Sequence, residues 1–231
     1  MIGDGKYPES CRFNVAVDCI VFGFDDDRLK LLLVKRMFEP CMNFWSLMGG
    51  FVGSDENLDD AAARILNRLT GLDDVYLEQL YTYGEPDRDP GGRVISVAYY
   101  ALIRTEKLDE ESGDGYPARW FSFDSLPELV FDHSDMVDKA IRRLRRKSLI
   151  QPVGFELLPE KFTLTQLQKL YEAIHQRQLD KRNFRKRILS MEVITRLDEK
   201  DRVSSKRGAW LYRFDREKYD RLIGGGDHFE M

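Results

Sequence analysis

Residues 50–72 place the strongest local constraint on the fold, because they combine a glycine turn, an acidic loop and a single capped helix. Asn57 is a residue type that accepts hydrogen bonds from the free N–H groups at a helix start, and Gly71 is the type that most often ends a helix. The apolar residues between them recur at helical spacing, so we expect one buried face. That face consists of Leu58, Ala61, Ala62, Ile65, Leu66 and Leu69.

The same stretch resembles a Nudix box, which folds as a loop, a helix and a closing turn. Counted from Gly50, the box is matched by Glu56, Arg64, Leu66, Gly71 and Leu72. The three glutamates that hold divalent cations in the family are replaced by Ile65, Arg68 and Leu69. Apolar side chains offer no lone pair and a guanidinium repels a cation, so we expect no metal, no cofactor and no catalytic residue. The alternative is an ordinary amphipathic helix that matches by chance.

The segments around this helix have the composition of strands. Residues 12–24 and 29–34 are rich in β-branched and apolar side chains and flank an Asp-rich turn, which favours a hairpin. Further strands are expected at 45–50, 75–83, 93–104 and 120–123, and a helix at 135–147. This order agrees with the α/β/α sandwich that the Nudix resemblance implies for residues 1–150.

Two loops are candidate parts of a ligand site. The segment 85–93 places charged residues between two prolines, and Nudix proteins of the ADP-ribose type have a similar loop near their ligand. Carboxylates and fork-shaped guanidiniums suit a polyhydroxylated or phosphorylated ligand, whereas a solvated turn is the alternative. We expect the second loop, around Phe38 and Pro40, to lie near the same pocket. The expected effector-binding residues are Glu39, Trp45, Asp87, Arg88, Asp89 and Arg93.

Charge divides the chain into two unlike parts. Residues 1–150 carry 19 Lys and Arg against 27 Asp and Glu, a formal charge of −8, whereas residues 161–231 carry 17 against 11, a charge of +6. This asymmetry suggests that only the second part meets a polyanion, although a solvated charged surface would give the same numbers. The basic run 142–147 has two interpretations: it is a solvated helix face, or it contacts DNA phosphates.

The second part has the pattern of a winged helix-turn-helix, predicted for residues 151–223, with a tail at 224–231. Thr163 and Gln166 form a capping box, Asp180 can cap a second helix, and residues 193–197 and 209–214 can form a wing around a polar loop. A surface helix and a surface hairpin are the alternatives. The expected DNA-binding residues are Thr165, Gln166, Lys181, Arg182, Asn183, Arg185, Lys186, Ser205, Lys206 and Arg207.

Taken over nearly its whole length, the sequence is similar to the Nudix-related transcription regulators. The motifs that carry this resemblance are the degenerate box, residues 45–52, 131–140 and 162–168, and the basic helix that follows Asp180. The family includes NrtR-type regulators, which sense ADP-ribose, and AraR-type regulators of Bacteroidetes, which sense L-arabinose. The resemblance favours a homodimeric repressor that binds a palindromic double-stranded operator and senses L-arabinose. ADP-ribose sensing and an active Nudix hydrolase are the alternatives.

Location and redox state are constrained by what the sequence contains. No apolar run approaches the roughly 20 residues of a membrane span, and the first residues do not have the pattern of a secretion signal. We therefore expect a cytoplasmic protein without a membrane partner. Its three cysteines, Cys11, Cys19 and Cys41, form neither a disulfide framework nor a metal-binding pair, so we expect reduced thiols. The predicted fold class is α+β, a Nudix sandwich followed by a winged helix domain.

Overall fold

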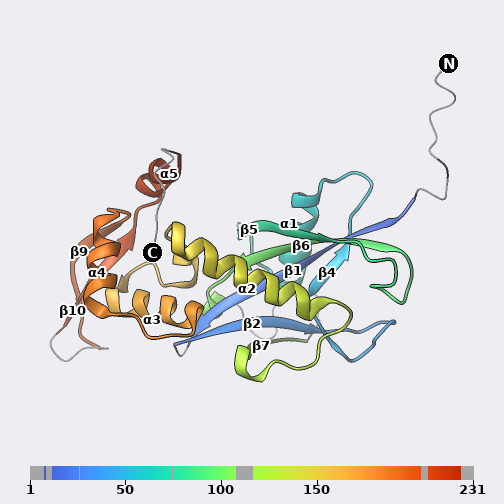
Figure 1. Cartoon of the computed structure of the whole chain (residues 1–231), viewed down its shortest axis with the longest axis horizontal. Helices are drawn as coiled ribbons and strands as arrows, with labels where there is room; N and C mark the ends of the chain where they lie inside the picture. Colours follow the sequence, from blue (N-terminus) through green and yellow to red (C-terminus); the bar gives the residue numbers. More distant parts are fainter. Residues whose placement is uncertain are drawn as a thin grey trace, which may run out of the picture.

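The computed structural model describes residues 8, 12–25, 27–73, 75–107, 117–203 and 208–224. Within these residues a mixed seven-stranded sheet forms one end of an elongated molecule (Figure 1). Strands β1 and β6 are parallel neighbours, and the other pairs are antiparallel. The strands are β1 (Asn14–Asp25), β2 (Arg28–Lys35), β3 (Trp45–Ser46), β4 (Met48–Phe51), β5 (Tyr76–Tyr83), β6 (Val94–Leu102) and β7 (Ala118–Ser122).

The expected hairpin is confirmed, because β1 pairs with β2 in a register that joins Asp25 to Arg28. Asp27 has a φ of 60°, the left-handed conformation that a two-residue hairpin turn requires and that Asp tolerates. The central strand β1 contacts three other strands, β2, β4 and β6. Its middle residues are therefore buried, which accounts for the long apolar run in the sequence.

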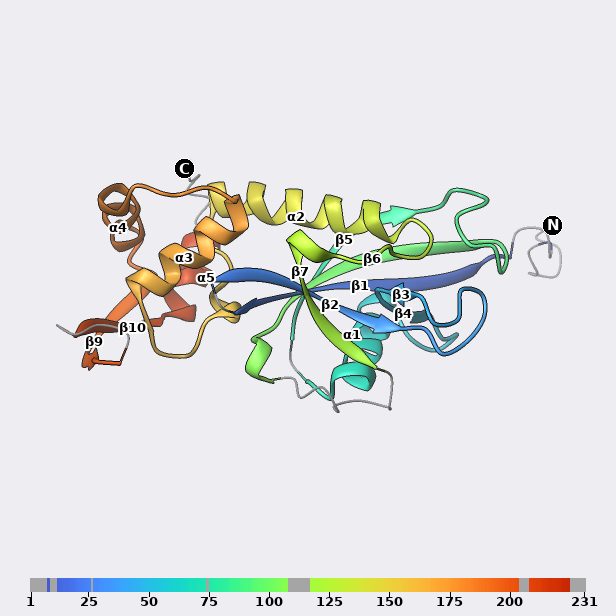
Figure 2. The ribbon, with the colours of Figure 1, turned by 90° about the horizontal axis from the view of Figure 1, so that it is seen from below.

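Two helices cover opposite faces of this sheet. Figure 2 shows α2 (His133–Ile150) along one face and α1 (Leu58–Thr70) on the other. The buried residues of α1, Ala61, Ile65 and Leu69 among them, form one apolar cluster with one side of the strands. Met136, Ala140 and Leu144 of α2 belong to a second cluster on the other side. The sheet therefore separates two apolar layers, the arrangement of a three-layer sandwich.

The predicted ends of α1 are confirmed. The Asn57 side chain accepts a hydrogen bond from the Asp60 N–H at 2.9 Å. Gly71 ends the helix with a φ of 70°, and its N–H donates to the Asn67 carbonyl. Gly adopts this conformation without a steric penalty, so the helix stops at a defined residue and the following chain turns away.

The remaining described chain folds as a three-helix unit with a small sheet. Thr163 and Gln166 form the predicted capping box at the start of α3, and Asp180 caps α4. The sheet has the strand order β8-β10-β9. The elements are β8 (Phe162–Thr163), α3 (Leu164–His175), α4 (Lys181–Ser190), β9 (Ile194–Asp201), β10 (Ala209–Phe214) and α5 (Arg216–Gly224), and short 3-10 turns occur at Thr105–Lys107, Phe123–Ser125 and Phe155–Leu157.

Several elements differ from the sequence expectation. Helix α2 runs from His133 to Ile150 instead of from Asp135 to Lys147. It ends at Ile150 because Gln151 is extended ahead of Pro152, as a residue before proline usually is. Strand β9 extends to Asp201, and α5 was not expected at all. Residues 225–231, which make up most of the predicted tail, lie outside the described residues. The division of the chain after residue 150 stays a prediction.

No helix in the described part of the chain is both long and apolar enough to cross a membrane. Cys19 and Cys41 are free thiols, and Cys11 lies outside the described residues.

Gly49 provides a test of the packing between β1 and β4. A Cβ atom at Gly49 would lie 2.1 Å from the Asp18 carboxylate, whereas a Cβ at Gly84 would meet nothing within 4 Å. We expect Gly49→Ala to lower the free energy of unfolding by about 1–3 kcal/mol, as overpacking in a core does. Gly84→Ala should change it by less than about 1 kcal/mol. Urea unfolding of both variants measures the difference, and equal stabilities would contradict the close approach.

Candidate functional site

A cavity of about 360 Å³ opens between the sheet, α1 and the beginning of α2. Apolar side chains and the glycines of β4 form much of its wall. Its charged and titratable lining residues are Asp18, Lys35, Arg36, Arg68, Arg88, Asp89 and His133. Four basic side chains therefore face two carboxylates, an excess of positive charge that favours an anionic ligand.

Arg88 is the centre of a buried ionic network beside this cavity. Its Nε and Nη2 atoms donate to the two oxygens of Asp132, at 2.8 and 2.6 Å. Nη2 also lies 3.7 Å from Asp18 Oδ2, and the same Asp18 oxygen accepts a hydrogen bond from Ser96 at 2.5 Å. The bidentate geometry satisfies a guanidinium that burial would otherwise penalise strongly. The network joins the loop 84–93 to β1, β6 and the N-cap of α2.

His133, the first residue of α2, is almost completely buried. Its Nδ1 atom accepts a hydrogen bond from the Leu47 N–H at 3.1 Å, so the ring proton belongs on Nε2, which lies 3.6 Å from Asp18 Oδ1. Burial lowers the pKa of His133, and the neighbouring Asp18 and Asp132 carboxylates oppose this shift. We therefore assign a neutral imidazole that fixes the chain before β4 to α2.

Glu56, the glutamate of the Nudix box that this chain keeps, is bound by neighbouring residues of the chain itself. The two carboxylate oxygens of Glu56 accept hydrogen bonds from Arg64, at 2.8 and 2.5 Å, and Oε1 also accepts one from the Gly53 N–H at 2.6 Å. The Arg64 and Gly53 donors lower the pKa of Glu56 to about 2. In the described residues no three His, Cys, Asp or Glu side chains are grouped to hold a metal ion. These residues do not fit the divalent cations of Nudix hydrolases.

Two arginines line the cavity, and their positive charge would repel a metal ion. Arg68 replaces a glutamate of the Nudix pattern and lines the cavity together with Leu69. The Arg36 guanidinium lies between two aromatic rings, 4.4 Å from the centroid of Phe38 and 5.1 Å from that of Phe131. Its Nε also donates to the Pro40 carbonyl at 2.8 Å. These contacts hold a charged, forked donor in place for a carboxylate or phosphate.

The expected effector residues are divided between the cavity and the surface. Arg88 and Asp89 line the cavity, whereas Glu39, Trp45, Asp87 and Arg93 do not. Glu39 and Asp87 are exposed. The Trp45 ring packs edge-on against Phe121, and Arg93 donates to the carbonyls of Gly84 and Glu85, which closes the loop.

Several lining residues were not identified from the sequence. Asp18 lies within an apolar strand, and His133 and Arg36 have no partner at a recognisable spacing along the chain. Their role depends on contacts between β1, β2 and α2, which are distant in sequence. Arg68 did carry a signal, because a basic residue at a metal-ligand position indicates a changed ligand preference.

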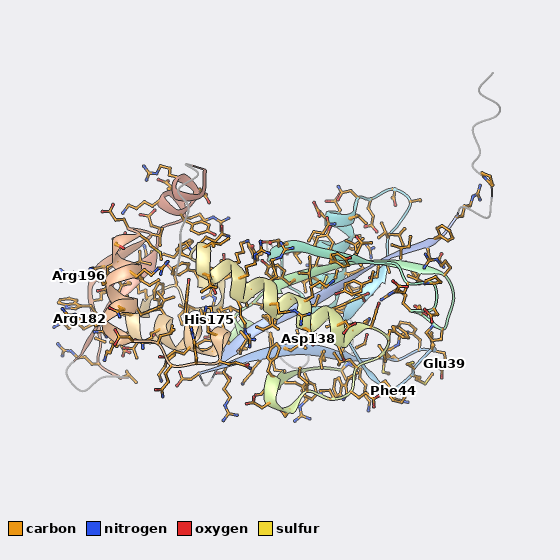
Figure 3. All side chains as sticks on the ribbon, in the orientation of Figure 1. Glu39, Phe44, Asp138, His175, Arg182 and Arg196 are labelled. Carbon is orange, nitrogen blue, oxygen red and sulfur yellow. The ribbon has the colours of Figure 1, made fainter. Side chains whose placement is uncertain are left out.

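The candidate DNA-binding residues lie at the other end of the molecule. Figure 3 shows Arg182 far from Glu39, which is next to the lining residue Phe38. Lys181, Arg182, Asn183 and Lys186 are exposed on α4, and Arg185 is half-buried. On α3, Thr165 is exposed, whereas the Gln166 side-chain oxygen accepts the Thr163 N–H in the capping box. Ser205, Lys206 and Arg207 lie outside the described residues.

The wing strands add basic residues that were not predicted. Arg196 and Lys200 of β9 lie over the ring of Trp210 of β10, at 4.8 and 4.3 Å from its centroid. Arg196 lies at the same end of the molecule as Arg182 (Figure 3). The aromatic ring holds both cations above the sheet, where a phosphate backbone alongside α4 could meet them.

Comparison with known proteins finds two family matches. Residues 12–140 match the NUDIX domain, and residues 154–214 match the NrtR DNA-binding winged helix domain. An ADPR-responsive transcriptional repressor of Acinetobacter baylyi is 36% identical over 210 residues, covering 89% of this chain and 84% of that protein.

Solved structures agree with these matches. The Shewanella oneidensis NrtR in complex with a 27mer DNA superposes with a TM-score of 0.81 at 30% identity, covering 89% of this chain and 95% of that one. The NUDIX domain of the same protein in complex with ADP-ribose gives a TM-score of 0.54 at 31% identity, covering 61% and 94%.

These comparisons confirm the predicted α+β class, a Nudix domain followed by a winged helix. They do not support L-arabinose as the effector, nor do they confirm the AraR-type subgroup, because the Acinetobacter baylyi repressor and the Shewanella oneidensis NUDIX domain are both named with ADP-ribose. ADP-ribose, the alternative effector, therefore fits better than L-arabinose, the effector expected from the sequence. The expected homodimer stays a prediction.

The neutral His133 predicts a pH dependence of stability. Because its pKa is lowered in the folded protein, the unfolded chain takes up the proton first as the pH falls through the ordinary value of about 6.5. Stability from this group is complete above that pH and decreases below it, by up to about 1.4 kcal/mol per pH unit. Urea unfolding at pH 7.5 and 5.5 should show the loss. His133→Gln should reduce it, and an unchanged pH dependence in that variant would contradict the assignment.

Proposed function

Because the chain belongs to the family of Nudix regulators that carry an NrtR-type winged helix domain, we propose that it is a transcriptional repressor whose Nudix domain binds ADP-ribose. The observation that carries the proposal is Arg68, a cation at a metal-ligand position of the Nudix box that faces the cavity. A site that has exchanged a carboxylate for a guanidinium favours a diphosphate in the absence of metal.

The chemistry of the cavity agrees with this ligand. Arg36 and Arg68 supply forked donors that match phosphate oxygens, and Asp18 and Asp89 supply acceptors for ribose hydroxyl groups. The cavity volume of about 360 Å³ lies within the range of sites for drug-sized ligands. A neutral pentose would form no ionic contact with Arg36 or Arg68, whereas a diphosphate would.

The same residues argue against hydrolysis as the main activity. Nudix hydrolysis needs carboxylates that bind divalent cations to polarise the diphosphate and activate water. Here Ile65, Arg68 and Leu69 occupy those positions, and Glu56 is held by Arg64 and Gly53. We infer that the bound nucleotide is a signal and leaves the site unchanged.

The winged helix domain supplies the output. Its exposed residues on α4 combine donors for guanine and adenine edges with cations for phosphates. We infer that α4 enters the major groove and that two protomers read the two halves of a palindromic operator. The similar Shewanella oneidensis protein is solved in complex with a 27mer DNA, which supports DNA binding by this chain.

Loss of two arginines from α4 tests the DNA-binding surface. We expect Arg182→Ala combined with Arg185→Ala to weaken operator binding by at least about tenfold, since each base or phosphate contact contributes about 1–3 kcal/mol. ADP-ribose binding should stay unchanged. The control, Arg12→Ala combined with Arg119→Ala, removes the same charge from exposed positions of the Nudix domain. Gel-shift titration compares the three proteins, and equal affinities would refute the assignment of α4.

Charge at position 68 tests the effector site. We expect ADP-ribose to raise the thermal unfolding midpoint of the wild-type protein in EDTA, without Mg²⁺, because a ligand of the folded state stabilises it by mass action. Arg68→Glu should abolish the shift, and Arg68→Lys should weaken binding by about tenfold or less, because lysine keeps the charge and loses the fork. A shift that requires Mg²⁺, or one given by L-arabinose alone, would contradict the proposal.

A turnover assay separates the receptor from a hydrolase. We expect no release of AMP when ADP-ribose is incubated with the protein and Mg²⁺, measured by chromatography over hours. Accumulation of AMP that disappears in the Glu56→Gln variant would show that the box has kept its catalysis.

A further inference from the structure

Helix α2 contacts the effector cavity at its first residues and the winged helix domain at its last turns. Figure 2 shows it running along the sheet from one domain to the other. We propose that α2 transmits effector binding to the recognition helix through two specific junctions, one at Asp132 and His133 and the other at Arg145 and Ser148. This inference rests on the proposed function, because it requires that the cavity binds ADP-ribose and that the winged helix domain binds operator DNA.

The cavity junction ties lining residues directly to the start of α2. Arg88 lines the cavity and holds both oxygens of Asp132, the N-cap residue. His133 also lines the cavity and accepts the Leu47 N–H. A ligand that contacts either side chain therefore acts on the first turn of α2 without an intermediate element. The Arg88 side chain is 3% exposed, so a ligand that draws it toward an anion has to displace Asp132 or move with it.

The body of α2 is built to move as one piece. Its 18 residues contain neither glycine nor proline, so the helix has no point at which kinks usually occur. At 1.5 Å per residue the helix spans about 27 Å. Its buried face, which includes Met136, Ala140 and Leu144, packs against the apolar layer of the sheet, so a displacement at one end of the helix is carried to the other end.

The second junction clamps α2 to the end of α3. Arg145 Nε donates to the Ile174 carbonyl at 2.7 Å. Ser148 Oγ donates to the Arg145 carbonyl at 2.8 Å and lies 2.9 Å from His175 Nε2, so its hydroxyl oxygen accepts from that ring nitrogen. Carbonyls in the last turn of a helix lack intrahelical partners and favour a cation. Arg145 supplies both the donor and the charge, which fixes the direction of α3 relative to α2.

Helix α3 in turn holds the recognition helix. The rings of Tyr171 and Phe184 pack edge to face with centroids 5.4 Å apart. Gln168 donates to the Leu179 carbonyl at 3.1 Å, and Glu172 accepts the Leu179 N–H at 2.9 Å, which fixes the turn before α4. A change in the direction of α3 is therefore carried to α4. In a two-fold dimer such a change alters the spacing of the recognition helices, which must match the half-sites.

A second connection between the domains is weaker. Lys169 of α3 pairs with Asp27 at the β1–β2 turn at 2.5 Å, but the two side chains are 43% and 55% exposed. Exposed ion pairs contribute little and are screened by salt. The Arg145 and Ser148 junction is partly buried and includes a hydrogen bond to the Ile174 backbone, so it is the stronger of these two polar connections.

The test is the ratio of operator affinities without and with saturating ADP-ribose. The probe is a duplex selected from random sequence by the wild-type protein, and binding is measured by fluorescence anisotropy. We expect a wild-type ratio between about 5 and 150, the usual range of allosteric coupling. In Arg145→Ala combined with Ser148→Ala the ratio should fall below about 3, while ADP-ribose binds the DNA-free variant with wild-type affinity. Arg146→Ala, which removes an exposed charge one residue away, should keep the wild-type ratio.

The cavity junction has its own pair of variants. Asp132→Asn breaks the ionic contact with Arg88 and should also lower the ratio, whereas Asp138→Asn, an exposed residue midway along α2, should not (Figure 3). These variants keep the proposal testable if the first pair unfolds. A wild-type ratio of 1 would overturn the proposed function and this inference with it. A wild-type ratio above 5 that persists in the Arg145 and Ser148 variant, or in Asp132→Asn, would overturn the inference alone.

Discussion

The ion pair between Arg88 and Asp132 is the contact on which the arrangement of the Nudix domain depends. It fastens the loop between β5 and β6 to the N-cap of α2, with Asp18 of β1 close to the same guanidinium. Three segments far apart in sequence thus meet at one buried charge. Removing any partner would leave an uncompensated ion, which is far more costly than the pair itself is stabilising. Arg88 also lines the cavity, so the group that stabilises the fold also faces the candidate ligand site.

The Nudix framework is present, and three residues of its box differ from the family pattern. The loop, the capped helix α1 and the Gly71 turn form as the family pattern predicts, and Glu56 remains in place with Arg64. What differs is that Ile65, Arg68 and Leu69 stand at the positions of the family's oxygen ligands, and that Arg68 and Leu69 line the cavity. The helix still packs against the sheet through its apolar side. These three substitutions therefore change the side chains at the ligand positions and leave the fold of the box intact.

The proposed function requires that the occupied and empty states of the cavity differ in how the protein meets DNA. Here the sheet and α2 lie between the cavity and the winged helix, and the buried residues of both domains form one continuous apolar cluster. Such a junction does not behave as a flexible linker. Packed interiors respond to a local change by shifting whole elements, which makes a long uninterrupted helix an effective means of connecting distant sites.

The sequence by itself determined the local features: the caps at Asn57, Thr163 and Asp180, the hairpin turn, the lost metal ligands and the exposed basic face of α4. These follow from neighbouring residues, whose interactions are fixed by spacing along the chain. The sequence could not show that Arg88 would meet Asp132, that Asp18 and His133 would line the cavity, or that Arg145 would contact α3. It also selected Arg93 and Trp45 for a cavity that neither lines. Only the tertiary structure decided these points, because each depends on which distant segments of the chain meet. The effect of a residue's charge or burial depends on the partner that the fold places beside it.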